Sequence, residues 1–220
     1  MNFLARCVLT LCFAFGAVLV GDAAGAAEDL SRVNGSVKVD PGQQAGDVST
    51  VNGSITIGAG ARVGDIDTVN GSLRLEDGAS ADSAATVNGS ITIGADTVVL
   101  NRVEAVNGSI TLRKAARVAG GLENVNGGMT LEGAQVDGGI ATANGDIRLA
   151  AGTRLTGGIK VEESKSWWKG DSSRNPRITI EQGVVVEGPF NFEREVDLYV
   201  APGVTVPPVE GVAPRRFKLD

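Results

Sequence analysis

The sequence predicts an all-β fold, a single-stranded parallel β-helix (a solenoid) with about 18 residues per coil. The first observation is a corner, a small apolar residue followed by Asn-Gly, which recurs at intervals of 18 or 19 residues; its asparagines are Asn34, Asn52, Asn70, Asn88, Asn107, Asn126 and Asn144. The second is a short alternation of polar and apolar residues after each corner. The third is the lack of a 3.6-residue period in a chain with 31 glycines, which disfavours long helices.

Each coil contains one clear strand and a second apolar series. Ser54-Ile55-Thr56-Ile57 alternates in polarity, so Ile55 and Ile57 should face the core. The second series precedes each corner and should also face inward: Val63, Ile66 and Val69; Leu100, Val103 and Val106; Val118, Leu122 and Val125; Val136, Ile140 and Ala143.

A β-sandwich or a meander of hairpins is the alternative fold, because hairpins also place Asn-Gly at their turns. The whole turn-strand-turn cycle repeats here with the same phase, which favours a parallel stack of coils. We expect eight or nine coils in a rod roughly 40 Å long, at about 4.8 Å per coil.

The Asn-Gly corner has a structural explanation. Both residues tolerate the positive φ of a tight bend, and stacked asparagines can form an amide ladder along the rod. Five corners also match the Asn-x-Ser pattern of glycosylation acceptors, but the bend explains the same residues.

Residues 1–26 are typical of a cleaved secretory signal peptide. Arg6 precedes an apolar run, Cys7–Val20, and Ala24-Gly25-Ala26 offers a small-residue cleavage site. The alternative is an uncleaved N-terminal anchor, which is less favoured because the apolar run is too short for a comfortable membrane span. We expect a periplasmic or extracellular mature chain without a transmembrane segment. Both cysteines lie in the signal, so that chain would have no disulfide.

The remaining chain divides into three parts. Regular coils are expected over 27–163, a polar insert over 164–176, and terminal coils with a cap rich in aromatic residues and proline over 177–220. The insert offers a candidate contact site for a partner, consisting of Lys165, Trp167, Trp168 and Lys169. Alternatively, the tryptophans cover an otherwise bare coil.

The cap prediction rests on composition. All aromatic residues outside the signal and the insert lie near the end of the chain, at Phe190, Phe192, Tyr199 and Phe217. A solenoid must cover its last coil, and large side chains suit that purpose. Four prolines, Pro202, Pro207, Pro208 and Pro214, should then stop further strand pairing.

The repeat resembles two groups of bacterial proteins. The Thr-Val-Asn-Gly-Ser-Ile cycle, as in Thr50–Ile55, resembles secreted adhesin-like β-helical domains of unknown function. Val136–Ile140, Leu155–Ile159 and Arg177–Gly188 look more distantly like bactofilins, which are right-handed β-helices that polymerise end to end. The resemblance therefore implies a right-handed coil and possible end-to-end self-association. This chain departs from bactofilins, which are usually cytoplasmic, in carrying a signal peptide.

Residues with recognisable chemistry are scarce. The chain has no histidine, and its mature part has no cysteine, so we expect no catalytic triad, no zinc site and no cofactor. Acidic residues precede some corners, at Asp67, Glu104 and Glu123, but Ser49, Ala85 and Ala141 interrupt the row. We interpret the row as a solvated edge.

These observations predict a non-catalytic secreted scaffold of the bacterial cell envelope, which binds an envelope protein or a glycan. A net charge of −6 argues against nucleic acid as a partner. A carbohydrate-binding or carbohydrate-active β-helix protein is the first alternative. An ice or ligand-lattice binder is the second, because Thr56, Thr92, Thr111 and Thr130 should form one outward row, although Lys38, Arg74 and Arg148 share it.

Overall fold

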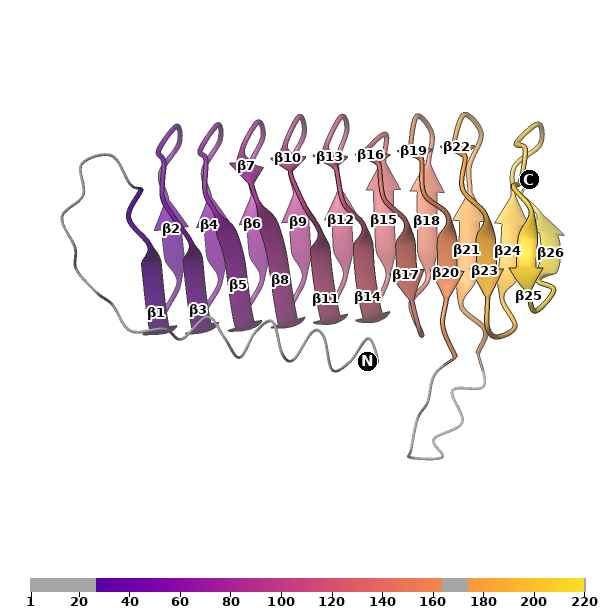
Figure 1. The fold of residues 1–220 in the computed structure, drawn as a ribbon, viewed down its shortest axis with the longest axis horizontal. Helices are drawn as coiled ribbons and strands as arrows, with labels where there is room; N and C mark the ends of the chain where they lie inside the picture. Colours follow the sequence, from indigo (N-terminus) through magenta and orange to yellow (C-terminus); the bar gives the residue numbers. More distant parts are fainter. Residues whose placement is uncertain (1–26, 164–173, 220) are drawn as a thin grey trace.

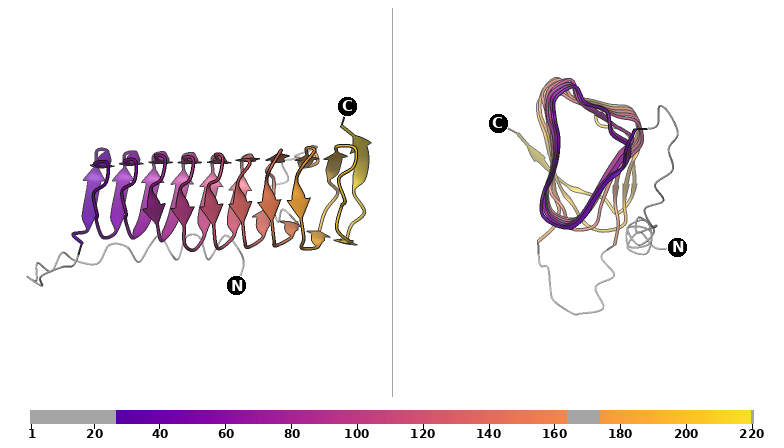
Figure 2. Two further views of the ribbon diagram at one scale, coloured as in Figure 1. Left: turned by 90° about the horizontal axis from the view of Figure 1, so that it is seen from above. Right: turned by 90° about the vertical axis from the view of Figure 1, so that its left-hand side faces the viewer.

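The chain folds as an all-β parallel solenoid with about 18 residues per turn (Figure 1). The computed structural model describes residues 27–163 and 174–219, and within them the chain forms 26 strands and no helix. Seen end on in Figure 2, most coils superimpose on one closed outline, from which the yellow C-terminal strand departs. The predicted fold class is confirmed.

Three parallel sheets form the sides of the rod. Sheet A contains, in spatial order, β1 (Leu30–Asn34), β3 (Val48–Asn52), β5 (Asp65–Asn70), β8 (Ser83–Asn88), β11 (Val103–Asn107), β14 (Leu122–Asn126), β17 (Ile140–Thr142), β20 (Ile159–Val161), β23 (Phe190–Phe192) and β25 (Val209–Gly211). Sheet B contains β2 (Val37–Val39), β4 (Ile55–Ile57), β6 (Leu73–Leu75), β9 (Ile91–Ile93), β12 (Ile110–Leu112), β15 (Met129–Glu132), β18 (Ile147–Ala150), β21 (Arg177–Ile180), β24 (Asp197–Val200) and β26 (Arg215–Lys218). Sheet C contains β7 (Ser80–Ala81), β10 (Val98–Val99), β13 (Arg117–Val118), β16 (Gln135–Val136), β19 (Arg154–Leu155) and β22 (Val185–Val186).

Each strand pairs with its equivalent one coil away. Ile55, for example, lies between Val37 and Leu73 in parallel register. Sheets A and B each have ten strands, so the rod has about ten turns rather than the expected eight or nine. The estimate was low because the last two strands, β25 and β26, lie in the proline-containing segment where no further strand pairing was expected.

The prolines near the end of the chain do not stop strand pairing, contrary to the prediction. Pro207 and Pro208 immediately precede β25, and Pro214 immediately precedes β26. A proline before a strand need not donate to its ladder, and the carbonyl of Pro208 still accepts a hydrogen bond from the Phe190 N–H at 2.9 Å.

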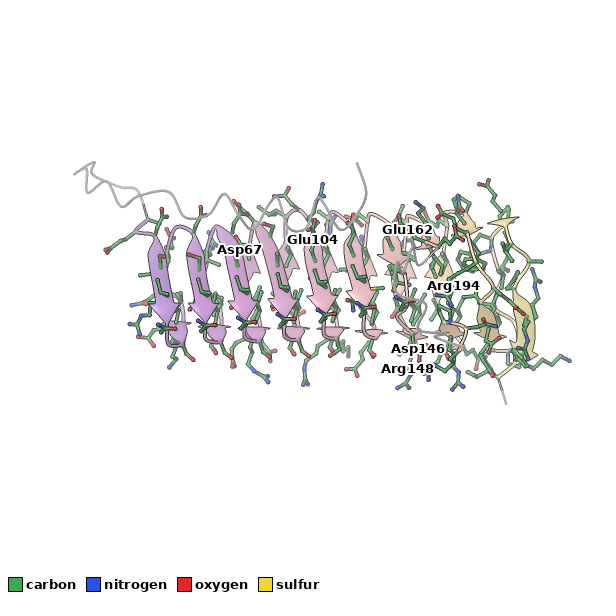
Figure 3. The ribbon with its side chains drawn as sticks, turned by 90° about the horizontal axis from the view of Figure 1, so that it is seen from below. Asp67, Glu104, Asp146, Arg148, Glu162 and Arg194 are labelled. Carbon is green, nitrogen blue, oxygen red and sulfur yellow. The ribbon has the colours of Figure 1, made fainter. Side chains whose placement is uncertain are left out.

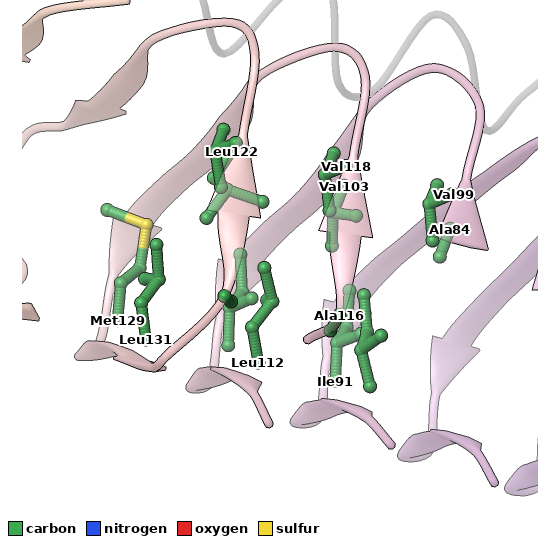
Figure 4. Packing of buried hydrophobic residues seen from close by; sticks show 14 of the residues in the cluster. Ala84, Ile91, Val99, Val103, Leu112, Ala116, Val118, Leu122, Met129 and Leu131 are labelled. Carbon is green, nitrogen blue, oxygen red and sulfur yellow. The ribbon is translucent and has the colours of Figure 1, made fainter. Parts of the chain in front are cut away.

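Stacked aliphatic side chains fill the interior (Figure 4). Both inward rows of sheet B are buried along the rod, as in Ile91 and Ile93, and confirm the alternating pattern. Phe190 and Phe192 are fully buried in sheet A, in register with Ile159 and Val161. Two of the four aromatic residues assigned to a cap are therefore core residues of the penultimate coils.

Most of the second apolar series faces the core as predicted, and the errors concern Leu100 and the residue directly before each Asn-Gly; the confirmed residues are Val63, Ile66, Val103, Val118, Leu122, Val136 and Ile140. In β3, β5 and β8 the threonine before each Val-Asn-Gly is buried, whereas the valine is only partly buried. Val69, Val106, Val125 and Ala143 thus lie on the outward side, where Val106 and Val125 pack against Val87 and Ala143. Leu100 is also misassigned: it is 55% exposed, and Val99 takes the inward position.

The inward threonines satisfy polar groups at the corners. The hydroxyls of Thr50, Thr68 and Thr86 donate to the carbonyl oxygens of corner glycines one coil back, at 3.0–3.1 Å. Asn124 occupies the same row, and its amide donates to the carbonyls of Gly108 at 2.8 Å and Gly127 at 2.9 Å. A buried carbonyl without a partner is costly, so a polar residue is favoured at this inward position.

Candidate functional surfaces

The seven corner asparagines form one continuous ladder along the outside of the rod. Each side-chain amide donates to the Oδ1 of the asparagine one coil back, over distances of 2.9–3.1 Å from Asn52 to Asn144. Arg194 ends the ladder from two coils further along the rod, because its Nη1 donates to Asn144 Oδ1 at 2.9 Å. The asparagines therefore link successive coils through their side chains.

The glycines of these corners are needed for close stacking more than for positive φ. None of the seven asparagines has a positive φ, contrary to the expectation. A Cβ on Gly53, Gly71 or Gly89 would collide with the carbonyl oxygen of the corner glycine one coil back. Only glycine allows neighbouring corners to approach to the strand spacing.

The acidic row is in register but is not a solvated edge. Asp67, Glu104 and Glu123 lie in one outward row of sheet A, with Ala85 between the first two (Figure 3). Glu104 is only 7% exposed, and its Oε1 lies 3.2 Å from Arg102 Nη1. Burial, and then the charges of Asp65, Asp47 and Glu104, raise the pKa of Asp67 to about 6.

A shallow groove of about 300 Å³ opens on sheet A further along the rod. Gly121, Gly139, Gly158 and Pro189 line it, and the polar side chains at its rim belong to Glu123, Lys160 and Asn191. Lys160 is held by Glu162 at 2.7 Å and Glu193 at 3.2 Å. Asp67 and Glu104 are absent from the lining, so the carboxylate with the raised pKa does not share this groove.

Sheet B presents the predicted row of threonines. Thr56, Thr92, Thr111 and Thr130 are partly exposed and stand in register, with Lys38, Arg74 and Arg148 in the same row. The row continues through Thr179 to Tyr199 and Phe217 at the C-terminal end.

The end of this row is a cluster of aromatic and arginine side chains that sequence reasoning missed. The rings of Tyr199 and Phe217 stack with centroids 4.7 Å apart and an interplanar angle of 14°. Arg177 lies over the Tyr199 ring at 5.1 Å, and Arg215 lies over the Phe217 ring at 5.6 Å. The signal was present, because Tyr199 and Phe217 are 18 residues apart, the length of one coil.

The predicted contact site of the insert, with Lys165, Trp167, Trp168 and Lys169, falls outside the described residues. It stays a prediction, as does the signal peptide over 1–26.

Within residues 27–163 and 174–219, no three metal-ligating side chains gather in a group that could hold an ion. The same part of the chain contains no helix of the length and hydrophobicity needed to cross a bilayer.

Comparison of the chain with protein-family models, with curated proteins and with solved structures gives no significant match. We therefore infer the function from the geometry of the rod.

Proposed function

We propose that this protein is a non-catalytic structural or interaction scaffold of the bacterial cell envelope, in the periplasm or at the cell surface. The main support is that each coil devotes the same polar residues to stacking, with an asparagine ladder outside and threonine-to-glycine hydrogen bonds inside. Such a repeat yields a stiff rod with long, regular faces. The apolar segment 1–26 and its small-residue cleavage site support export.

The two ends of the rod favour a particle of fixed length over a filament. Arg32 takes the inward register position of Thr50 in the first coil, and Arg216 and Lys218 take those of Leu198 and Val200 in the last. Stacking a second rod on either end would bury these charges without partners, at a cost of several kcal/mol. Inward-pointing charges are a known protection of exposed sheet edges. We therefore propose that the rod does not polymerise end to end as bactofilins do. We also propose that its coil is right-handed, as theirs is.

Glycan binding is the second candidate function, and the aromatic-arginine cluster on sheet B favours it. A carbohydrate-active enzyme has less support, because the groove and the carboxylate with the raised pKa lie on different coils.

Cell fractionation and mass spectrometry test the scaffold proposal. The tagged chain should appear in the envelope or the medium with about its first 26 residues removed. A full-length chain confined to the cytoplasm would overturn the proposal. Purified protein incubated with acidic and neutral polysaccharides should release no reducing ends. Release that scales with protein concentration would overturn the non-catalytic role.

A further inference from the structure

The aromatic-arginine cluster is an ordered, outward-facing feature at one end of an otherwise polar sheet. Tyr199 and Phe217 are partly exposed, and Arg177 and Arg215 are exposed. Stacking on a ring engages the face of a guanidinium and leaves its N–H donors in the plane. The rings therefore restrict the orientation of the two arginines without using their hydrogen bonds.

The two arginines differ in their ion pairs. Arg215 Nε lies 3.6 Å from Asp197 and 3.9 Å from Glu195, so two carboxylates already face it. Arg177 has no carboxylate partner within 4.0 Å in the part of the chain that the structure describes. Its backbone N–H donates to Asp146 Oδ1 at 2.9 Å, but the guanidinium does not take part in that bond.

The other cations near the cluster also divide into those with an ion pair and those without one. Arg148 pairs with Glu181 at 2.6 Å, and Arg174 pairs with Asp146 at 2.8 Å. Arg216 and Lys218 of β26 have no ion pair among residues 27–163 and 174–219. Among the described residues, Arg177 therefore offers a partner an unpaired positive charge on the outward face of sheet B, whereas Arg216 and Lys218 take inward register positions at the end of the rod.

This end also differs in charge from the body of the rod. Residues 27–163 carry 11 basic and 17 acidic side chains, whereas residues 174–219 carry six of each. An anionic polymer would be repelled by the acidic body of the rod but not by the net charge of this end, so a local unpaired cation can hold it here.

We propose that this end of sheet B binds an anionic polysaccharide through its carboxylate or phosphate groups, with Arg177 as the main contact. A guanidinium with free donors suits both groups, because it can bind two of their oxygens at once. The stacked rings add apolar surface with a polar hydroxyl at Tyr199, which suits a sugar better than a bare ion.

A linear polymer fits the geometry better than a small anion. The cluster continues into a straight row through Thr179, Arg148 and Thr130, with about 4.8 Å between coils. The Arg177 side chain is exposed on the outward face of the sheet. A chain lying along the rod could meet Arg177 and then the hydroxyl row. This inference rests on the proposed scaffold role, since it names what the scaffold holds.

The test is a binding titration with fluorescently labelled polygalacturonate as the carboxylate probe and dextran phosphate as the phosphate probe, with neutral dextran as the reference. At least one anionic probe should bind saturably, and its affinity should fall as salt rises. Binding no stronger than to dextran would overturn the inference. Equal binding of a DNA duplex would also overturn it, by showing a non-specific response to phosphate charge.

Arg177→Gln should weaken binding by about tenfold or more, the effect of losing a charge-assisted hydrogen bond. Arg74→Gln is the matched control, because Arg74 is exposed in the same outward row but lies in the third strand of the sheet. Equal weakening by both variants would contradict a local site. Arg177→Lys keeps the charge but loses the planar fork, so it should bind with intermediate affinity.

Thermal melts of the variants separate binding from folding. Because Arg177 is exposed, its variants should melt with wild-type midpoints. A variant that loses affinity only in proportion to a loss of folded protein would count against the site. Reducing-end release in the same mixtures would overturn the non-catalytic scaffold role alone, so the failures of the two proposals remain distinguishable.

Discussion

Thr86 should stabilise the core through its hydroxyl, so we expect Thr86→Val to destabilise the protein although valine is the more apolar residue. The Thr86 side chain is 2% exposed, and its Oγ1 donates to the carbonyl oxygen of Gly71 at 3.1 Å. Valine has nearly the same shape but places a methyl group against that oxygen.

The magnitude follows from two opposing effects. Losing the hydrogen bond and leaving the buried carbonyl without this donor costs about 1–3 kcal/mol. Replacing the hydroxyl by a methyl group returns about 0.8 kcal/mol of apolar burial. The net loss of unfolding free energy should be about 1 kcal/mol, which corresponds to a fall of about 2–4 °C in the melting midpoint for a chain of this size.

Urea and thermal melts of Thr86→Val, with Val87→Thr as the matched control, make the measurement. Val87 is next in sequence but faces outward and is partly exposed, so Val87→Thr should change stability by no more than about 0.5 kcal/mol. If the valine before the corner faced inward, as the sequence predicted for Val69 and Val106, the two variants would show the opposite order of stability. A stabilised Thr86→Val together with a strongly destabilised Val87→Thr would refute the inward threonine row.

Three further variants test burial, charge and polar satisfaction. Ile91→Asp should lower the free energy of unfolding by several kcal/mol because it buries an unpaired charge, whereas Thr92→Asp on the outward side should lower it little. Comparable urea midpoints for the two variants would contradict the assigned faces. Asp67→Asn should stabilise the protein at pH 7, because the pKa of Asp67 is raised to about 6 and folding therefore disfavours its charged form. The wild type should gain stability as the pH falls from about 7 to 4, so the difference in melting midpoint between the two proteins should disappear. A difference that does not change with pH would exclude this titration. Asn124→Thr should stabilise the protein by about 1 kcal/mol in the same melts, because the Asn124 Oδ1 is buried without a partner among the described residues and threonine is the residue at this inward position in other coils. A lower midpoint would show that the hydrogen bond from the Asn124 amide to the Gly127 carbonyl contributes more.

The fold could be predicted because the chain repeats its own structure. An interval of 18 or 19 residues between Asn-Gly corners fixes the coil length, and the pairs Ile55–Leu73 and Ile91–Ile110 follow directly from it. The asparagine ladder follows from the same interval.

The faces of the last two residues before each corner could not be read from hydrophobicity. Thr50 and Val51 are adjacent, and a polarity rule assigns the valine to the core. The structure reverses them because the corner carbonyls need a donor inside the rod, and no local pattern shows that need. The burial of Glu104 was missed for a related reason: exposure depends on what packs around a row, not on the row's own residues.

The cluster on sheet B was partly predictable. The 18-residue spacing of Tyr199 and Phe217 places them in neighbouring coils, but their prediction as cap residues rested on composition alone. Arg177 and Arg215, which lie over these rings, come from the different strands β21 and β26. Only the strand register shows that the two arginines share one face of sheet B.

The most direct test of the parallel stack is an electron-spin distance between two labelled coils. Cysteines would replace Thr56 and Thr179, which lie in the same outward row, with Cys7 and Cys12 changed to serine. Six coil steps separate the two positions in the register, so one narrow distance near about 29 Å is expected at about 4.8 Å per step. A distance below about 20 Å, or a broad distribution without a maximum near this value, would contradict a continuous parallel solenoid.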